Sequence, residues 1–348
     1  MDPVNRRARR LPAGDGDGNG APAGAVERSV PEHPRSPAGA TSDGAPVAGG
    51  DILPLHGTLG HLVRRAQQVH TALFTEELDG HLTGPQYAVL SALAAGAPLS
   101  QREVGRLASL DKSTTADIVS RLERNGWLRR RRSPQDARRN LLELTGSSRA
   151  ALESVTGKVA RVQERLLAVL DEADRGSFVD LLGRVAYRGR LPDPESPDAA
   201  APGTAPALGL TTTPGHLLRR VEQVHASLWG EHVGGLITPS QYAILSALYG
   251  RPSMNQVTAG ELASLDKSST ADIVARLERR GLVTVARDAG DGRQKVLSLA
   301  PDVRETHLQL TERVQRVQAA LAEPLLDGEL GTLVGWLDRV AFRDAGSS

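Results

Sequence analysis

Apolar residues recur at intervals of three and four along much of this chain, which is the spacing of an amphipathic helix. The clearest stripe lies within residues 147–170 and consists of Leu152, Val155, Val159, Val162, Leu166 and Leu170. We predict a helix there and three others in the first half of the chain. These cover about 55–79, Thr83 to about 95, and 174–188.

A different pattern lies between these helices. Ser100 and Glu103 have the spacing of a capping box, which predicts the start of a short helix. Another helix is predicted from about Ser113 to Asn125, ending at Gly126, because glycine commonly follows the last helical turn. The stretches WLRRRR (127–132) and NLLEL (140–144), on either side of the turn SPQDAR, then predict two short strands of a β-hairpin.

The whole pattern occurs twice. Residues 107–126 and 262–281 are identical at seventeen of twenty positions, and three other stretches repeat at the same offset of 155 residues. The two halves align without a gap over about 125 residues. This period is far longer than the roughly 20–50 residues of solenoid repeats, so the sequence predicts one domain that has been duplicated.

Composition divides the chain into four segments. Residues 1–50 are rich in Gly, Pro, Ala and Ser and poor in large apolar residues, so we predict a disordered tail. Residues 51–188 and 210–345 are the two predicted domains. Residues 189–209 between them form a predicted linker rich in Pro and Ala.

Composition and motifs also exclude several classes of protein. The chain contains no cysteine, which excludes disulfides and thiolate metal sites. It has no motif of a phosphate-binding loop, a serine hydrolase or a zinc protease, so we predict no enzyme activity and no cofactor. We find neither a signal peptide nor an apolar run of membrane-spanning length. We therefore expect a cytoplasmic protein without a membrane partner.

Two short helices followed by a β-hairpin describe a winged helix-turn-helix. The apolar face of the helix from Ser113 to Asn125 consists of Thr115, Ile118, Val119 and Leu122. Its opposite face is small, polar and basic, which suits a helix that enters the major groove of DNA. A solvated amphipathic helix would have the same pattern, so the helix alone does not decide between the two.

The basic hairpin favours DNA binding. Residues 121–140 hold eight arginines against Glu123 and Asp136, whereas residues 276–295 hold six basic and three acidic residues. A wing with this charge favours contact with phosphates or with a narrow minor groove. We therefore predict that both halves bind double-stranded DNA and that the first half binds it more strongly.

On these motifs each half resembles the MarR family of transcriptional regulators (multiple antibiotic resistance type). The resemblance rests on the helix DKSTTADIVSRLERNGW with the wing RRRRSPQDARRNLLELT, and on the second copies, DKSSTADIVARLERRGLV and GDGRQKVLSLA. It implies a mainly α-helical fold with small β-wings. It also implies that Arg138 and Arg293 enter the minor groove and that Asp136 and Asp291 hold them in place.

The charge pattern and the resemblance together predict the residues that contact DNA. In the recognition helices these are Lys112, Ser113, Thr114, Asp117, Arg121, Arg124, Lys267, Ser268, Ser269, Asp272, Arg276 and Arg279. In the wings they are Arg130, Arg132, Asp136, Arg138, Arg139, Arg287, Asp291, Arg293 and Lys295.

Asp117 and Asp272 depart from the family, which often has a basic or polar residue at this position. Each carboxylate either accepts a hydrogen bond from cytosine N4 or favours the positive N-terminal end of its helix. We prefer the second interpretation.

The family normally acts as a homodimer joined through its terminal helices, whereas this chain carries both copies. We therefore expect an intramolecular pseudodimer, a functional monomer that presents two recognition helices to a pseudo-palindromic operator and acts as a repressor. The apolar stripes of the terminal helices are expected to form the contact between the halves. Further dimerisation of two chains stays open.

Family members commonly release DNA when a small aromatic or phenolic effector binds. The residues predicted to line such a site are His70, Phe74 and Tyr87 in the first half, and His225, Trp229 and Tyr242 in the second. Plain core packing would use the same residues. Phe74 and Trp229 are the main difference between the copies, so we do not expect the two pockets to be equivalent.

Two alternative functions are kept. One is a metal-responsive regulator, although the scattered histidines predict no metal site. The other is a small-molecule-binding module whose DNA binding is weakened.

Overall fold

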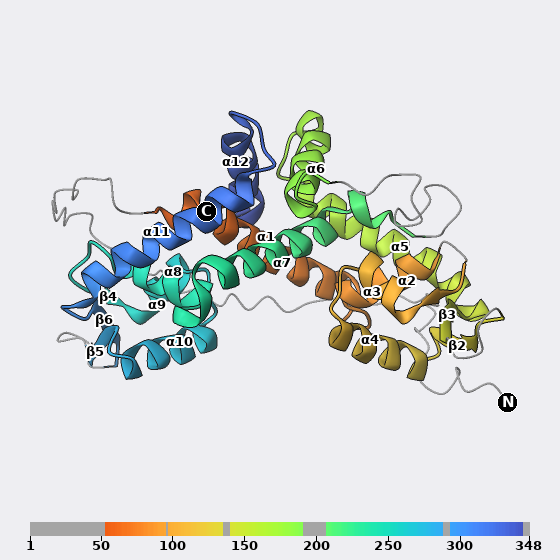
Figure 1. Ribbon diagram of the computed structural model, residues 1–348, viewed down its shortest axis with the longest axis horizontal. Helices are drawn as coiled ribbons and strands as arrows, with labels where there is room; N and C mark the ends of the chain where they lie inside the picture. The colour runs from red at the N-terminus through yellow and green to blue at the C-terminus, as the bar shows by residue number, and fades with distance from the viewer. Residues whose placement is uncertain (1–52, 95–96, 135–139, 191–206, 288–292, 344–348) are drawn as a thin grey trace, which may run out of the picture. The chain divides into compact units, whose positions relative to one another are not determined.

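We describe the fold from a computed structural model of the chain (Figure 1). The structure describes residues 53–94, 97–134, 140–190, 207–287 and 293–343. The predicted tail over 1–50 and most of the predicted linker lie outside these ranges, and both stay predictions.

The first half consists of helices and a short hairpin in the predicted order. Its helices are α1 (Leu59–Glu77), α2 (Gly84–Ala94), α3 (Gln101–Leu107), α4 (Lys112–Arg124), α5 (Gly146–Leu167) and α6 (Glu172–Ala186). Its hairpin consists of β2 (Leu128–Arg132) and β3 (Asn140–Leu144). The predicted elements are confirmed to within a few residues, and the capping box at Ser100 and Glu103 is present.

Two local features differ from the prediction. Leu55–Gly57 form a separate 3-10 turn, and α1 begins only after Thr58, which has extended backbone and donates its hydroxyl to the Pro54 carbonyl oxygen at 2.8 Å. A two-residue strand, β1 (Leu99–Ser100), pairs antiparallel with β3. Two residues are too few to show a period, so sequence patterning misses this strand.

The second half repeats the same elements. Its helices are α7 (Pro214–His232), α8 (Pro239–Leu248), α9 (Gln256–Leu262), α10 (Lys267–Arg279), α11 (Val303–Ala322) and α12 (Glu329–Ala341). Its strands are β4 (Met254–Asn255), β5 (Val283–Arg287) and β6 (Lys295–Leu299). The two sheets have the equivalent orders β1-β3-β2 and β4-β6-β5.

Each hairpin is anchored at its base. The antiparallel register places Leu128 opposite Leu144 in the first half and Val283 opposite Leu299 in the second. Leu128, Leu144 and Val283 are buried, while the other residues of β2 are exposed. The hairpin therefore extends from the core as a wing beside the helix-turn-helix.

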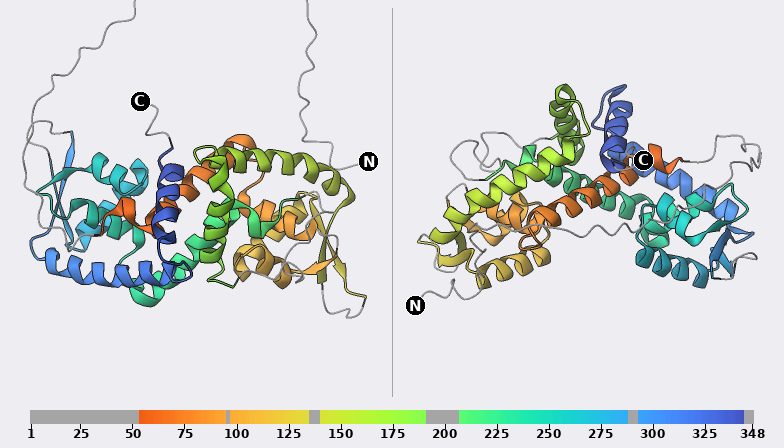
Figure 2. Two further views of the ribbon diagram at one scale, coloured as in Figure 1. Left: turned by 90° about the horizontal axis from the view of Figure 1, so that it is seen from above. Right: turned by 180° about the vertical axis from the view of Figure 1, so that it is seen from behind.

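Four helices join the two halves (Figures 1 and 2). In the first half α1 packs against α7 and α12, and in the second half α7 packs against α1 and α6. We call these four helices, α1, α6, α7 and α12, the seam. The chain therefore contains two winged helix-turn-helix domains joined as an intramolecular pseudodimer.

Of the terminal helices that were predicted to join the halves, α1, α6, α7 and α12 do so, whereas the stripe within 147–170 contributes mainly to the core of its own half. Leu152, Val159 and Val162 are buried, but α5 packs chiefly against α1 of its own half. The helical period shows that one face of α5 is covered and does not identify the element that covers it.

Two glycines permit a close approach of α1 and α7 across the seam. A Cβ atom at Gly215 of α7 would overlap the buried imidazole of His70 on α1, and one at Gly60 would overlap that of His225. At the same points Gln163 accepts a hydrogen bond from the Gly215 N–H at 2.9 Å, and Gln318 accepts one from the Gly60 N–H at 3.0 Å. At each of these glycines, the backbone of one half therefore packs against an imidazole of the other half.

We predict that Gly215→Ala destabilises the protein, because the added methyl group displaces the buried His70 ring. Overpacking of this kind costs about 1–3 kcal/mol. The matched control is Gly157→Ala on α5, where a Cβ atom meets open space and alanine improves helix propensity by about 0.5–1 kcal/mol. Denaturant unfolding measures both; equal effects of the two substitutions would contradict the proposed close approach.

Candidate DNA-binding surface and interlobe cavity

An aspartate caps each candidate recognition helix. The Asp111 carboxylate accepts hydrogen bonds from the backbone N–H groups of Ser113 and Thr114 at 2.9 Å and from their hydroxyls at 2.7 and 2.6 Å. These bonds, the Thr114 hydroxyl first, hold the pKa of Asp111 below its ordinary value. Asp266 caps α10 at the equivalent position. The first turn of each helix is therefore fixed by a residue to which the sequence analysis gave no role.

The predicted DNA contacts of α4 and α10 lie on the exposed side of each helix. The opposite side of α4 is buried through Thr115, Ile118, Val119 and Leu122, as predicted. The exposed predicted residues are Lys112, Ser113, Asp117, Arg121, Arg124, Lys267, Ser268, Asp272, Arg276 and Arg279, and the half-buried ones are Thr114 and Ser269. Each helix thus presents hydroxyl groups near its start and arginines near its end.

The preferred interpretation of Asp117 and Asp272 is wrong. Both residues lie in the second turn, and neither α4 nor α10 has an acidic residue in its first turn. The favourable effect of a carboxylate on the helix dipole falls off beyond that turn. Asp111 and Asp266 occupy the capping positions instead, and contact of Asp117 and Asp272 with cytosine stays a prediction.

Two ion pairs reduce the free charge of the first wing. Arg129 contacts Glu143 across the hairpin, with 2.8 Å between Nε and Oε1. Arg130 contacts Glu123 of α4, with 2.9 Å between Nε and Oε2. Glu143 lies just outside the segment in which charge was counted, so the excess of positive charge in the first wing is smaller than the sequence analysis indicates.

The other predicted wing residues fall into two groups. Those that are exposed on the described parts of the wings are Arg132, Arg287, Arg293 and Lys295. Those outside the described residues are Asp136, Arg138, Arg139 and Asp291. The predicted contact of each wing aspartate with the wing arginine therefore stays a prediction.

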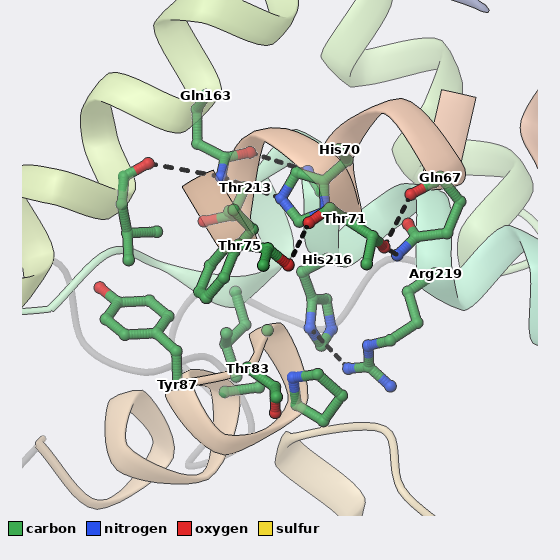
Figure 3. Close-up of a pocket in the computed structure, with 17 residues that line it drawn as sticks. Gln67, His70, Thr71, Thr75, Thr83, Tyr87, Gln163, Thr213, His216 and Arg219 are labelled. Atoms are coloured by element: carbon green, nitrogen blue, oxygen red, sulfur yellow. Dashed lines mark hydrogen bonds between the residues drawn. The ribbon is translucent and has the colours of Figure 1, made fainter. Parts of the chain in front are cut away.

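A cavity of about 110 Å³ lies between the two halves (Figure 3). One wall contains the three predicted residues of the first half, His70, Phe74 and Tyr87. The facing wall comes from α7 of the second half and includes His216 and Arg219. The sequence did not predict this second wall, although His216 and Arg219 belong to the stretch HLLRRVEQVH (216–225), which repeats residues 61–70.

The cavity combines a cation with neutral imidazoles. Burial, and then the charge of Arg220, lowers the pKa of Arg219 to about 10, so Arg219 is protonated at neutral pH. Burial, and then the charge of Arg219, lowers the pKa of His70 to about 4, and the same two causes lower the pKa of His216. No carboxylate is among the described residues that line the cavity. Its electrostatics therefore favour an anion.

Two buried polar atoms at this cavity have no hydrogen-bond partner among the described residues. They are Nδ1 of His70 and Oε1 of Gln67. A buried polar atom without a partner carries a desolvation cost of about 1–3 kcal/mol. A ligand that brings a donor or acceptor into the cavity would relieve this cost.

Arg219 also connects the cavity to the helix-turn-helix of the first half. Its guanidinium donates to the carbonyl oxygens of Ala108 at 2.6 Å and Ser109 at 2.8 Å, in the turn between α3 and α4. Ser109 has a left-handed backbone with φ of 52°, and the cap Asp111 follows two residues later. A side chain of one half therefore holds the turn that sets the direction of the other half's recognition helix.

The second half has an equivalent but smaller cavity of about 30 Å³. It brings together the predicted residues His225, Trp229 and Tyr242 with Arg64 of α1. Arg64 donates to the Ala263 carbonyl oxygen at 2.7 Å, which mirrors Arg219. All six predicted effector residues thus lie at the two cavities, which differ in size, as the sequence analysis expected.

Known proteins similar to this chain are bacterial regulators. A family model described as MarR family matches residues 82–139 and 237–294. HTH-type transcriptional repressor NicR of Pseudomonas putida is 32% identical over 128 residues, which are 36% of this chain and 81% of the relative. Transcriptional regulator HosA of Escherichia coli O111:H- is 32% identical over 125 residues, which are 36% of this chain and 92% of the relative.

Solved structures include similar chains. The PcaV transcriptional regulator from Streptomyces coelicolor, in complex with its natural ligand, is 40% identical, with a TM-score of 0.38. The match covers 39% of this chain and 96% of that chain.

The duplicated fold and its exposed recognition helices define a winged helix-turn-helix DNA-binding protein. Each curated relative is matched over most of its length by about a third of this chain. The chain belongs to the MarR family, and it carries two copies of the family's domain. It is a DNA-binding transcriptional regulator, and its relatives are regulators rather than enzymes.

Two other kinds of feature are absent from the described residues. None of the described helices has the length and apolar character needed to cross a bilayer. Among the described residues, no three His, Asp or Glu side chains come together as a metal site.

We predict that acid destabilises the fold through buried histidines. Burial lowers the pKa of His70, His225 and His307 to about 4, against 6.5 in the unfolded chain. Between pH 6.5 and 4 the unfolded chain therefore binds more protons, so the free energy of unfolding falls as the pH falls through this window. Each of these histidines should contribute about 2 kcal/mol of the loss between pH 7.5 and 5.

His307→Leu provides the control, because Leu152 is the equivalent residue of the first half. This variant should lose about 2 kcal/mol less than the wild type on acidification. Denaturant unfolding at pH 7.5 and pH 5 measures the difference. The same pH dependence in both proteins would show that His307 is not held neutral by burial.

Proposed function

We propose that one chain represses transcription by binding a pseudo-palindromic operator with both halves, and that a small aromatic acid releases it. The observation that carries the proposal is the seam, which joins two complete winged helix-turn-helix domains within one polypeptide. Two recognition helices fixed in one unit suit half-sites that are about one turn of DNA apart. The relative NicR is named as a transcriptional repressor, which supports repression rather than activation.

We assign base contacts to the exposed side of α4 and α10 and phosphate or minor-groove contacts to the wings. Arg121 and Arg276 occupy equivalent exposed positions in these helices. Because Arg130 and Arg129 are engaged by Glu123 and Glu143, the first wing has less free charge than its sequence indicates. We therefore expect only a modest advantage of the first half, and an imperfect palindrome as operator.

The effector that fits the larger cavity is an aromatic carboxylate. Arg219 supplies the cation, and His70 Nδ1 and Gln67 Oε1 supply unpaired polar atoms. An anion that draws the guanidinium towards the cavity competes with its bonds to Ala108 and Ser109. Loss of those bonds loosens the turn before α4, which lowers the affinity for DNA.

Arg121→Ala and Arg276→Ala should each weaken operator binding by about 1–3 kcal/mol, roughly 5- to 150-fold. Each variant should lose protection over a different half-site, because the two arginines belong to different halves. Arg316→Ala is the control, since it removes an exposed arginine from α11, a helix that packs chiefly against α7. Gel shifts and footprinting measure these effects. Loss of the same half-site in both variants would refute the two-half-site arrangement.

Benzoate, 2-hydroxybenzoate and 4-hydroxybenzoate should be screened for release of operator DNA. An active compound should weaken DNA binding by about 1–3 kcal/mol. Arg219→Gln should raise the concentration needed for half-release about tenfold or more, measured against the variant's own DNA affinity, because a charged hydrogen bond is lost. An unchanged half-release concentration in Arg219→Gln would place the effector elsewhere.

A further inference from the structure

The two cavities at the seam occupy equivalent positions in the two repeats but differ in volume. The cavity beside Phe74 has a volume of about 110 Å³, and the one beside Trp229 has about 30 Å³. The smaller volume is enough for one or two water molecules, which is too little for a six-membered ring with a carboxylate. A dimer of identical halves would have two equal cavities, so the difference comes from substitutions between the copies.

Trp229 accounts for much of the lost volume. Its indole is buried, lies 5.7 Å from the His225 ring and makes an edge contact with Tyr242 at 6.0 Å between centroids. Its Nε1 donates to the Ile237 carbonyl oxygen at 2.7 Å. Phe74 has a smaller ring and no donor, so the first half cannot make this bond. The indole is therefore both larger than the phenyl ring and fastened in place.

A second set of substitutions fixes the wall behind the indole. Tyr242 stacks on His307 with 5.5 Å between centroids and an angle of 6°. His307 also stacks on Tyr249 at 4.5 Å and bonds Ser246 at 3.2 Å. The first half has Leu152 and Ala94 in place of His307 and Tyr249, so it lacks this stack.

The polar groups of the two cavities also favour ligand binding in the larger cavity. The unpaired atoms His70 Nδ1 and Gln67 Oε1 belong to the larger cavity. At the position equivalent to Gln67 the second half has Glu222, whose charge acts on both Arg64 and Arg219. This carboxylate therefore does not distinguish the two cavities, and the difference in their polar groups rests on the unpaired atoms His70 Nδ1 and Gln67 Oε1.

We infer that the chain binds one effector molecule, in the cavity between Phe74 and Arg219, and that Trp229 closes the equivalent site of the second half. The inference rests on the proposed effector function. Because Arg219 bonds the turn before α4, the single effector acts first on the recognition helix of the first half. Release of DNA should therefore follow a binding curve with a Hill coefficient of one.

Isothermal titration of the full chain with benzoate, 2-hydroxybenzoate and 4-hydroxybenzoate tests this inference. We expect one molecule bound per chain. Phe74→Trp places the tryptophan of the smaller cavity in the larger one and should weaken binding at least tenfold. Trp229→Phe places the phenylalanine of the larger cavity in the smaller one. It should raise the number of sites from one to two, or reveal a second, weaker site.

The outcomes separate the two proposals. Two equivalent sites in the wild-type chain would overturn the one-site inference and leave the effector function in place. Binding of none of the three acids would overturn both, while operator binding measured in parallel would be unaffected. Thermal unfolding shows whether each variant is folded. If Trp229→Phe does not fold, the stoichiometry of the wild-type chain and the affinity of Phe74→Trp still test the one-site inference.

Discussion

The close packing of α1 against α7 is the constraint on which the rest of this structure depends. At two points the backbone of one helix touches an imidazole of the other, His70 at Gly215 and His225 at Gly60. No larger residue fits at either glycine without displacing a buried ring. This approach brings Arg64 and Arg219 within reach of the opposite half, and it makes the two domains a single unit.

The same packing links the cavity to the DNA-binding surface. Arg64 and Arg219 each line one cavity and donate to carbonyl oxygens that precede the recognition helix of the other half. The chain thus has two copies of one connection, and of the two described cavities the one beside Phe74 is the larger. Duplication within one chain permits this difference, because Phe74 and Trp229 can change independently.

Much of this arrangement is predictable from sequence, because helical period and capping are local. The bounds of α4, its buried face and the capping box at Ser100 follow from residues within a few positions of one another. Contacts between distant segments cannot be predicted in this way. No residue near Arg219 in the sequence indicates that its side chain reaches Ser109. The ion pair of Arg129 with Glu143 depends on the register of the hairpin. Asp117 was misjudged because the true cap, Asp111, lies six residues earlier in the sequence.

The mass of the complex with a single operator duplex tests the central claim most directly. Light scattering or sedimentation should give one chain per duplex, with both half-sites protected in the footprint of that complex. Such a result follows if the seam makes each chain a complete unit with two recognition helices. Two chains on one duplex, each protecting one half-site, would contradict this account.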